Sequence, residues 1–429
     1  MKKLLLILLI SFAARFLVSF IVWHPDVRNH MDWGIRFFEY GPAKFFEPES
    51  NVWNFTWPNQ PPGTIYMFAG IRKIFEAVFA GFWWLNVKIP AFPSGIITFF
   101  ESNLYPALLK LPAILADIGI ALLIYKFINH QSLIIKNKEK IALLGVTFFL
   151  INPAVWYNST IWGQYDSVIN FLALLAFYFL LRRKLVVSVL FLALSLYTKA
   201  SLFIFIPIFA IVAMRQKYKL STYFIAGGLS LLTIGLLTLP FSRGEPLAWL
   251  FDLYQNKVFV QQLHVITANA LNFWAGLTGI YEQPESLPLL GLTYHSWGLI
   301  LFSLSYLPAL YLVYKKQDIK SVMWALAISA LSSFMLLTNM HERYLYPLFA
   351  PFTILAVLEA RLLPLYWAVS GVSVINLWHL WWTPKVQELI DFMSFGDRLM
   401  PRILGFINFG LFLVIYRRFL RLLGSPRLQ

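Results

Sequence analysis

The sequence has no cysteine and few charged residues. Cysteine is absent from all 429 positions, which excludes disulfide bonds and thiolate chemistry but identifies no compartment. Charged residues make up 13%, against roughly a quarter in an average soluble domain. Apolar residues make up 59% and aromatics 18%, more than one soluble core can bury. A soluble enzyme and a disordered or fibrous chain are therefore excluded. Because the apolar runs are continuous rather than alternating, a helical membrane protein is expected.

Apolar runs long enough to cross a bilayer recur along the chain and predict an all-α polytopic protein of about twelve spans. A stretch at 185–214 breaks near Lys199 and is interpreted as two short spans, with a re-entrant pair as the alternative. The first run is kept as an anchor rather than a cleaved signal, because no small-x-small site precedes His24. Including this first run, the spans outside 185–214 are expected at about 4–22, 107–127, 141–157, 167–181, 221–240, 296–314, 321–338, 345–360, 363–380 and 402–416.

The net charge of +15 is explained by topology rather than by a nucleic-acid partner. With cytoplasmic N- and C-termini, the basic clusters near 136–140, 182–184, 215–219, 315–320 and 417–421 all fall inside, as the positive-inside rule requires. The clusters all lie on the cytoplasmic side only if the apolar run 64–82 does not cross the membrane, because one more span would place most of them outside. Arg72, Lys73 and Glu76 share one face of that run, which is typical of an interfacial amphipathic helix. Two large external loops are therefore expected, at 24–106 and 241–295.

Carboxylates that could act as a general base follow the first span. Asp26 and Asp32 flank His30 there, and burial under the external loop is expected to raise the pKa of such a carboxylate. The alternative is a solvated loop in which an Asp caps a helix. In the second span, Lys110 and Asp117 lie seven residues apart on one helix face. They are interpreted either as a functional pair in the membrane or as a polar contact that joins two helices.

Further polar and aromatic candidates lie at the predicted outer ends of other spans. Their mixture of amide, carboxylate and aromatic groups is typical of sugar recognition, although helix caps, interface aromatics and snorkelling lysines have the same composition. These candidates are Trp162, Gln164, Asp166, Lys199, Asn269 and Asn272. The run His341, Glu342, Arg343 and Tyr344 ends another apolar segment, and its Arg side chain is a planar fork suited to phosphate. A structural salt-bridge cluster is the alternative.

Nucleotide and metal motifs are missing. The sequence contains no Walker loop, no GxGxxG and no HExxH-like spacing, so no cofactor, no metal site and no coupling to nucleotide hydrolysis is expected.

Taken together, the motifs resemble those of glycosyltransferases of the GT-C fold, in particular the prokaryotic relatives of the GPI-anchor mannosyltransferases. The asparagine-linked-glycan glucosyltransferases of the endoplasmic reticulum are more distantly similar. The matching positions are Asp26 with Trp33, the Pro-Pro-Gly turn at 61–63, Lys110 with Pro112 and Asp117, Trp162-Gly163-Gln164 with Asp166, and His341 to Tyr344 with Pro347. The Pro-Pro-Gly turn departs from the family pattern at Asn59 and Gln60. The resemblance covers about residues 20–350.

The resemblance implies a GT-C-like bundle in a prokaryotic plasma membrane, with its active site on the external face. It implies an inverting transfer of a hexose such as mannose from a polyprenyl-phosphate donor to a lipid, glycan or protein acceptor. Asp26 has the family position of the base, and Asp32 is the second candidate. The partners would be this donor, the acceptor and membrane lipids, with no nucleic acid. A flippase or transporter of lipid-linked sugars, and an oligosaccharide ligase or polymerase, remain as alternatives.

Overall fold

The computed structural model describes residues 2–47, 52–130, 136–258 and 263–423. The described chain is all-α apart from one two-stranded hairpin, β1 (Pro288–Leu289) and β2 (Leu292–Thr293). In the first half, the helices are α1 (Lys2–Ser19), α2 (Val27–Tyr40), η1 (Pro42–Lys44), α3 (Pro62–Lys88), α4 (Gly95–Ile128), α5 (Lys138–Leu150), α6 (Pro153–Trp156), η2 (Tyr157–Trp162), α7 (Asp166–Leu181), α8 (Leu185–Thr198), η3 (Ala200–Phe205) and α9 (Ile206–Arg215).

In the second half, the helices are α10 (Leu220–Ser242), α11 (Pro246–Leu253), η4 (Tyr254–Val258), α12 (Phe273–Thr278), α13 (Tyr294–Lys315), α14 (Ile319–Leu336), η5 (Glu342–Leu348), α15 (Phe349–Leu358), η6 (Ala360–Leu362), α16 (Leu363–Trp378) and α17 (Gln387–Leu423). Here η2 and η4 are π-helices and the other η segments are 3₁₀-helices. Residues 395–398 interrupt the helical backbone of α17.

Six of the described helices are long and apolar enough to cross a membrane, and a bent pair formed by α5 with α6 and η2 makes a seventh if it is one span. The chain is thus a helical protein with the composition of a membrane protein. The other predicted spans coincide with shorter helices, such as α7 and α8, or with α1, which carries Lys2, Lys3 and Arg15. A 16-residue helix such as α7 is about 24 Å long, less than the ~30 Å hydrocarbon core.

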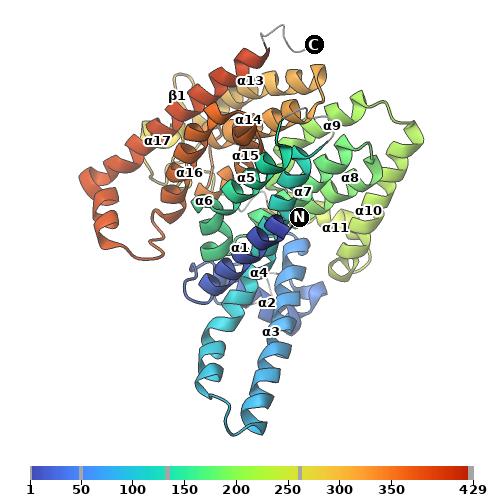
Figure 1. Ribbon diagram of the computed structural model, residues 1–429, viewed down its shortest axis with the longest axis vertical. Helices are drawn as coiled ribbons and strands as arrows, with labels where there is room; N and C mark the ends of the chain where they lie inside the picture. Colours follow the sequence, from blue (N-terminus) through green and yellow to red (C-terminus); the bar gives the residue numbers. More distant parts are fainter. Residues whose placement is uncertain (1, 48–51, 131–135, 259–262, 424–429) are drawn as a thin grey trace.

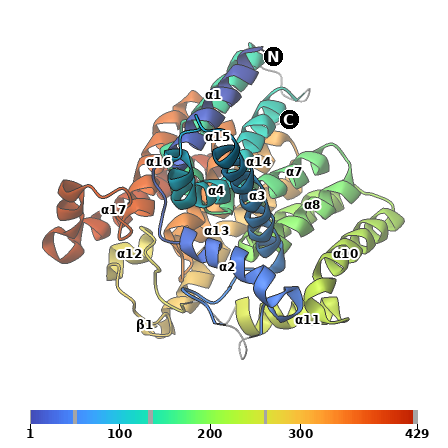
Figure 2. The ribbon, with the colours of Figure 1, turned by 90° about the horizontal axis from the view of Figure 1, so that it is seen from below.

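Helix α14 lies at the centre of the bundle and is almost wholly buried. It packs against α13, α15 and η5, and α4 packs against α5 and α7 to complete the core. Helices α10 and α17 lie at opposite edges of the bundle, as Figures 1 and 2 show. Their apolar side chains are largely exposed, for example Leu236 and Phe406. Exposed leucine and phenylalanine on edge helices fit contact with lipid, because a soluble protein would bury them.

The predicted break near Lys199 is confirmed. Helix α8 ends at Thr198, Lys199 is extended, and η3 begins at Ala200. The predicted helix at 64–82 is present and longer than expected, because α3 begins at Pro62 and ends at Lys88. Its predicted polar face is confirmed by ion pairs of 2.8 Å from both Arg72 and Lys73 to Glu76.

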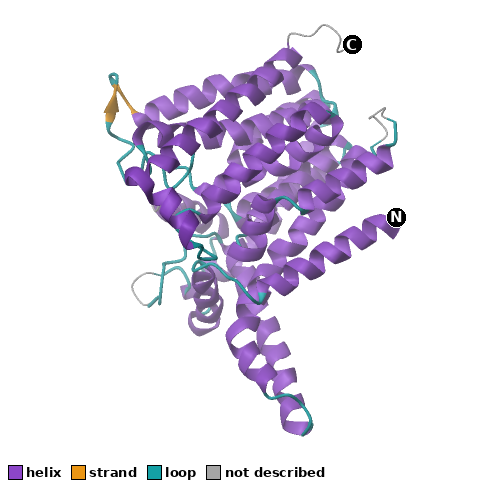
Figure 3. Ribbon diagram, turned by 60° about the vertical axis from the view of Figure 1, so that its left-hand side comes forward, coloured by secondary structure: helices purple, strands orange, loops and turns teal. Residues whose placement is uncertain are grey.

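Helix α3 and the first part of α4 form a hairpin that projects from the bundle (Figures 1 and 3). The base of α3 packs on α2 and α4 through Ile65 and Phe68, which are buried. Toward the tip, Trp83, Trp84 and Val87 are 53%, 58% and 62% exposed. Exposed tryptophan beside lysine is typical of residues at a membrane–water interface, which agrees with an interfacial rather than a spanning helix.

We expect both ends of α3 to lie on the same side of the membrane. Because the chain has no cysteine, Asn59→Cys, at an exposed residue just before α3, and Phe82→Cys each introduce a single thiol. Labelling of sealed vesicles with an impermeant thiol reagent should modify both variants from the external side. Labelling of Phe82→Cys only from the cytoplasmic side would contradict the interfacial assignment and invert the predicted topology.

Candidate functional site

A cavity of about 1300 Å³ opens where the loops between the helices converge. It is larger than most small-molecule pockets, which occupy roughly 300–1,000 Å³. Its walls come from the start of α2, the segment before α3, the turn after η2, the break between α8 and η3, the segment 263–269 and the start of η5. Most of the residues predicted for the site lie in these segments. The predicted residues that line the cavity are Asp26, Gln164, Asp166, Lys199, Asn269, His341, Glu342, Arg343 and Tyr344.

Asp26 immediately precedes α2 and points its carboxylate at the turn after η2. Its Oδ2 accepts hydrogen bonds from Trp162 Nε1 at 3.0 Å and from Gln164 Nε2 at 3.1 Å. The side chain makes no capping bond to α2, so the alternative in which Asp26 only caps a helix is not the one observed. The two donors hold one carboxylate oxygen and thereby orient the group in the wall of the cavity.

The expected rise in the pKa of Asp26 is wrong in sign. Burial is the largest influence and acts to raise the pKa, but the nearby Arg343 guanidinium and the Trp162 hydrogen bond act against it, and the net result is a pKa below the ordinary value. Composition predicted the burial but could not show that an Arg 317 positions away would face the carboxylate. Asp26 is therefore ionised at neutral pH.

Two histidines beside Asp26 are uncharged at neutral pH. Burial lowers the pKa of His24 to about 3 and that of His30 to about 4, although the Asp26 charge opposes both shifts. The His24 ring stacks on Trp162 with centroids 4.1 Å apart, and His30 stacks on Phe68 at 4.4 Å. Both imidazoles thus serve as flat packing surfaces around the carboxylate rather than as countercharges.

The turn that presents Gln164 depends on a glycine. Gly163 ends the π-helix η2 with φ of +75°, a conformation that costs other residues energy. A Cβ at this position would lie 2.9 Å from Lys110 Cγ. Trp162 is fully buried and does not line the cavity itself; it reaches Asp26 only through Nε1.

Glu342 and Arg343 are adjacent at the start of η5; Glu342 is buried, whereas the Arg343 side chain is 15% exposed. The Arg343 guanidinium lies over the rings of Trp162 and Tyr344, 5.6 and 5.7 Å from their centroids. Its Nη1 is 3.4 Å from Glu342 Oε1, whereas its buried Nε has no hydrogen-bond partner. Burial raises the pKa of Glu342 to about 7, although the Arg343 charge opposes the rise. At neutral pH Glu342 therefore neutralises Arg343 only in part, and a cation with spare donors faces the cavity.

Lys199 and Asp166 form an ion pair of 2.7 Å in the cavity wall. Lys199 lies in the extended residue between α8 and η3, and Asp166 is the first residue of α7. The Pro-Pro-Gly turn fixes this break. A Cβ on Gly63 would lie 2.9 Å from Thr198 Cα, and Thr64 donates a hydrogen bond to the Thr198 carbonyl. The turn thus positions Lys199 through close backbone contact, which is a role that its sequence did not reveal.

Lys110 and Asp117 do not line the cavity. Lys110 Nζ donates to the carbonyls of Ser19 and Val22, where α1 ends and the chain turns toward Asp26. Asp117 accepts a hydrogen bond from Tyr346 and forms an ion pair of 2.7 Å with Arg15. These contacts join helices, so the packing alternative describes both side chains better than direct substrate binding.

Asp32 and Asn272 also lie outside the cavity lining. Asp32 accepts hydrogen bonds from the backbone and side-chain nitrogens of Asn54, at 3.0 and 2.8 Å. Asn272 caps α12 and donates to the Phe334 carbonyl. Asn269 does line the cavity, but its side-chain amide is held by His379. Asp32 and Asn272 therefore hold loops in place. Asp32, the second candidate for the base, faces a different segment from Asp26.

Trp381 and a cluster around Glu285 also belong to the cavity, although neither was among the residues predicted from sequence. Trp381 lines the cavity and packs edge-on against His24 at 4.3 Å. Glu285 accepts from Thr338 and lies 3.2 and 3.0 Å from His264 and His295 at the same cavity. Arg15, which lies outside the cavity lining, was also not among the predicted residues, although a charged residue inside a predicted span is itself a signal of function. No sequence pattern links Glu285 to its histidines, because loop contacts bring them together.

No family model matches the chain, and no curated protein matches it in sequence.

Proposed function

We propose that the chain is a membrane glycosyltransferase with a GT-C-like bundle of about twelve spans. In this proposal it transfers a hexose from a polyprenyl-phosphate carrier to a lipid, glycan or protein acceptor at the external membrane face. The observation that carries the proposal is the oriented, ionised Asp26 carboxylate in one cavity with the incompletely neutralised Arg343 guanidinium. A base and an anion site in one cavity are what this displacement requires.

The transfer would proceed as a single displacement. The acceptor hydroxyl oxygen forms a bond to the anomeric carbon while the bond from that carbon to the donor phosphate oxygen breaks. The hydroxyl proton passes to Asp26, and the electron pair of the broken bond leaves with the polyprenyl phosphate. Attack from the side opposite the phosphate inverts the anomeric centre. Arg343 would stabilise the charge that develops on the phosphate as it changes from a diester to a monoester.

The surroundings of the cavity suit a sugar between these two groups. Trp33, Tyr344 and Trp381 supply aromatic faces, and Asn29, Gln164 and Asn339 supply amide groups. The proposal is favoured over transport of a lipid-linked sugar because Lys110 and Asp117, the polar track that transport would use, are bonded between helices. The ionisable and amide groups that converge on one cavity support chemistry at one site rather than a polar track across the membrane.

We expect purified protein to release polyprenyl phosphate from at least one member of a panel of synthetic polyprenyl-phosphate hexoses when lipid-linked glycan acceptors are supplied. The product should carry the inverted anomeric configuration, which NMR of the purified glycan would show. Polyprenyl-diphosphate oligosaccharides are the matched control donors. Release from these alone would favour the ligase alternative, and flipping of labelled donor between leaflets without release would favour a transporter.

A further inference from the structure

We propose that Arg15 is a positioning residue that fixes the Asp26 segment and the Arg343 segment relative to each other. This inference rests on the proposed transferase function for its kinetic consequence. Its structural consequence, a fixed environment for residue 26, does not depend on that function.

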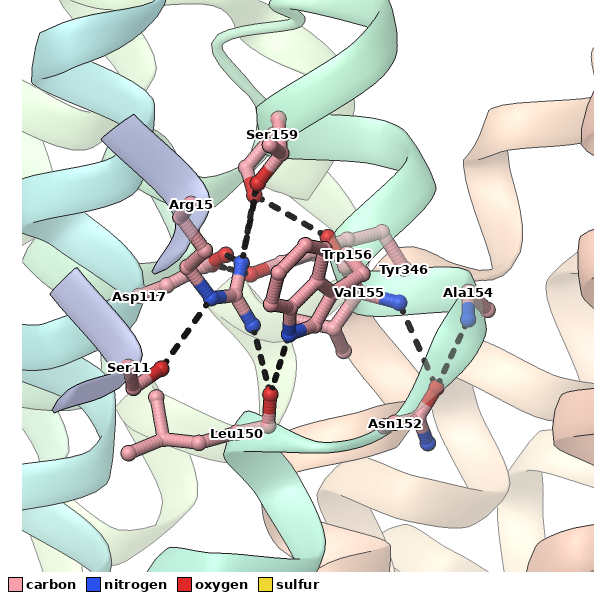
Figure 4. A network of polar contacts seen from close by, with 11 residues as sticks. Ser11, Arg15, Asp117, Leu150, Asn152, Ala154, Val155, Trp156, Ser159 and Tyr346 are labelled. Carbon is pink, nitrogen blue, oxygen red and sulfur yellow. Dashed lines mark hydrogen bonds and ion pairs between the residues drawn. The ribbon is translucent and has the colours of Figure 1, made fainter. Parts of the chain in front are cut away.

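Arg15 lies one turn before the end of α1 and is fully buried. Its Nη1 donates to Asp117 Oδ2 at 2.7 Å and to Ser159 Oγ at 2.8 Å, and its Nη2 donates to the Leu150 carbonyl at 2.9 Å (Figure 4). The guanidinium also lies 5.0 Å from the centroid of the Trp156 ring. One side chain on α1 thus contacts α4, the end of α5 and the α6–η2 segment.

The first branch from Arg15 leads to Asp26. Ser159 lies on η2, the π-helix that ends at Trp162, and the Trp162 and Gln164 side chains donate to the Asp26 carboxylate. The His24 backbone N–H donates to the Ile161 carbonyl at 3.1 Å and joins the segment between α1 and α2 to η2. Wide-turn π segments are frequent at functional sites. Arg15 therefore holds η2 in the position from which Trp162 and Gln164 reach Asp26.

The second branch leads to Arg343. Asp117 receives the Arg15 ion pair on one carboxylate oxygen and a hydrogen bond from Tyr346 on the other. Tyr346 lies three residues after Arg343, one turn along η5. Tyr346 is buried, and Figure 4 shows its hydroxyl directed toward this network. The Arg15–Asp117 pair therefore also holds η5 in place, and with it the Arg343 guanidinium.

A buried ion pair contributes little net stability to a fold. Apolar side chains of similar volume often replace such a pair without loss of stability, whereas removal of one partner leaves an uncompensated charge. A pair that served only packing would therefore be replaceable by apolar residues with activity retained. A positioning pair would not, because a displacement of about 1 Å at a reacting centre can reduce the rate up to roughly 100-fold. A double substitution by uncharged residues therefore distinguishes a packing role from a positioning role.

The test uses Tyr346→Phe, which removes only the link from Asp117 to η5, and the double variant Arg15→Met with Asp117→Leu, which removes both charges. Tyr223→Phe is the matched control, because its hydroxyl donates to the Ala213 carbonyl away from the cavity. We expect all three to melt close to the native protein. Both network variants should lose kcat by roughly tenfold or more while the donor KM changes less, and the control should retain native kinetics.

An activity-independent reporter completes the test. Asp26→Cys introduces the chain's single thiol beside Arg343, and the pH dependence of its alkylation reports the surrounding charge. We expect this profile to shift to higher pH in both network variants and to stay unchanged with Tyr223→Phe. A native reporter profile together with native kcat in the network variants would overturn the proposal. If native protein releases no polyprenyl phosphate from any donor, the transferase proposal fails, and the reporter alone still decides the role of Arg15.

Discussion

Asp26→Asn should abolish sugar transfer while the protein still folds and binds its donor. The amide is nearly isosteric with the carboxylate and keeps an oxygen for Trp162 and Gln164, but it cannot take up the acceptor proton. Positioned general bases contribute roughly 10²–10⁴-fold to a rate, so the loss should be at least of that order. Turnover of saturating donor and acceptor by folded protein measures this loss, and donor binding to the same sample shows that the cavity is intact.

Asp32→Asn is the matched control for this prediction. Asp32 lies on α2, which Asp26 immediately precedes, but it binds Asn54 instead of facing the cavity, so its substitution should weaken the loop and change kcat much less. Retained activity in Asp26→Asn together with loss in Asp32→Asn would move the base to Asp32. Retained activity in both variants would remove the base from this segment.

The pH profile gives the same assignment a second check. The neighbouring Arg343 charge helps to hold the pKa of Asp26 below its ordinary value against the effect of burial, so the base stays ionised down to an unusually low pH. Activity should therefore not fall at mildly acidic pH through protonation of Asp26. The low pKa also makes Asp26 a weaker proton acceptor than the sequence-based expectation implied.

Much of the helical organisation could be predicted from sequence, because long apolar runs have few alternatives in a membrane protein. The break at Lys199 and the start of α3 at Pro62 follow from local residues in the same way. The lengths of α4 and α17 could not be read from apolar runs alone. Both helices continue past their apolar parts, since helix propensity does not stop where hydropathy does.

Contacts in the candidate site could be predicted where both residues belong to one short motif. They could not be predicted where the two residues come from distant segments. Gln164 follows Trp162 at a fixed turn, so both reach Asp26 together. Lys110 and Asp117 were harder to assign, because an ionisable residue inside a span is equally compatible with a ligand and with an internal partner. The decisive partner of Asp117 is Arg15, 102 positions earlier in the chain, and no local pattern pairs them.

Substitutions of Arg343 should have the next largest effect, and they should act through the donor. The Arg343 guanidinium combines a buried Nε without a hydrogen-bond partner with a neighbour, Glu342, whose pKa is raised by burial to about 7. Loss of a single donor to a developing negative charge typically costs roughly 10²–10³-fold in kcat. Arg343→Ala should therefore lose at least that factor in kcat/KM for the donor.

Arg343→Lys and Glu342→Gln separate charge from geometry in this prediction. Lysine keeps the charge but not the bidentate fork, so Arg343→Lys should fold and still lose much of the donor turnover.

Below about pH 7 Glu342 is neutral and Arg343 is free to bind phosphate, whereas above that pH the Glu342 carboxylate competes with phosphate, so the donor KM should rise with pH. Glu342→Gln should remove that rise and leave a low KM throughout. Donor kinetics across pH 6–8 measure both effects, and native kinetics in Arg343→Lys would make the His341–Arg343 run a structural cluster.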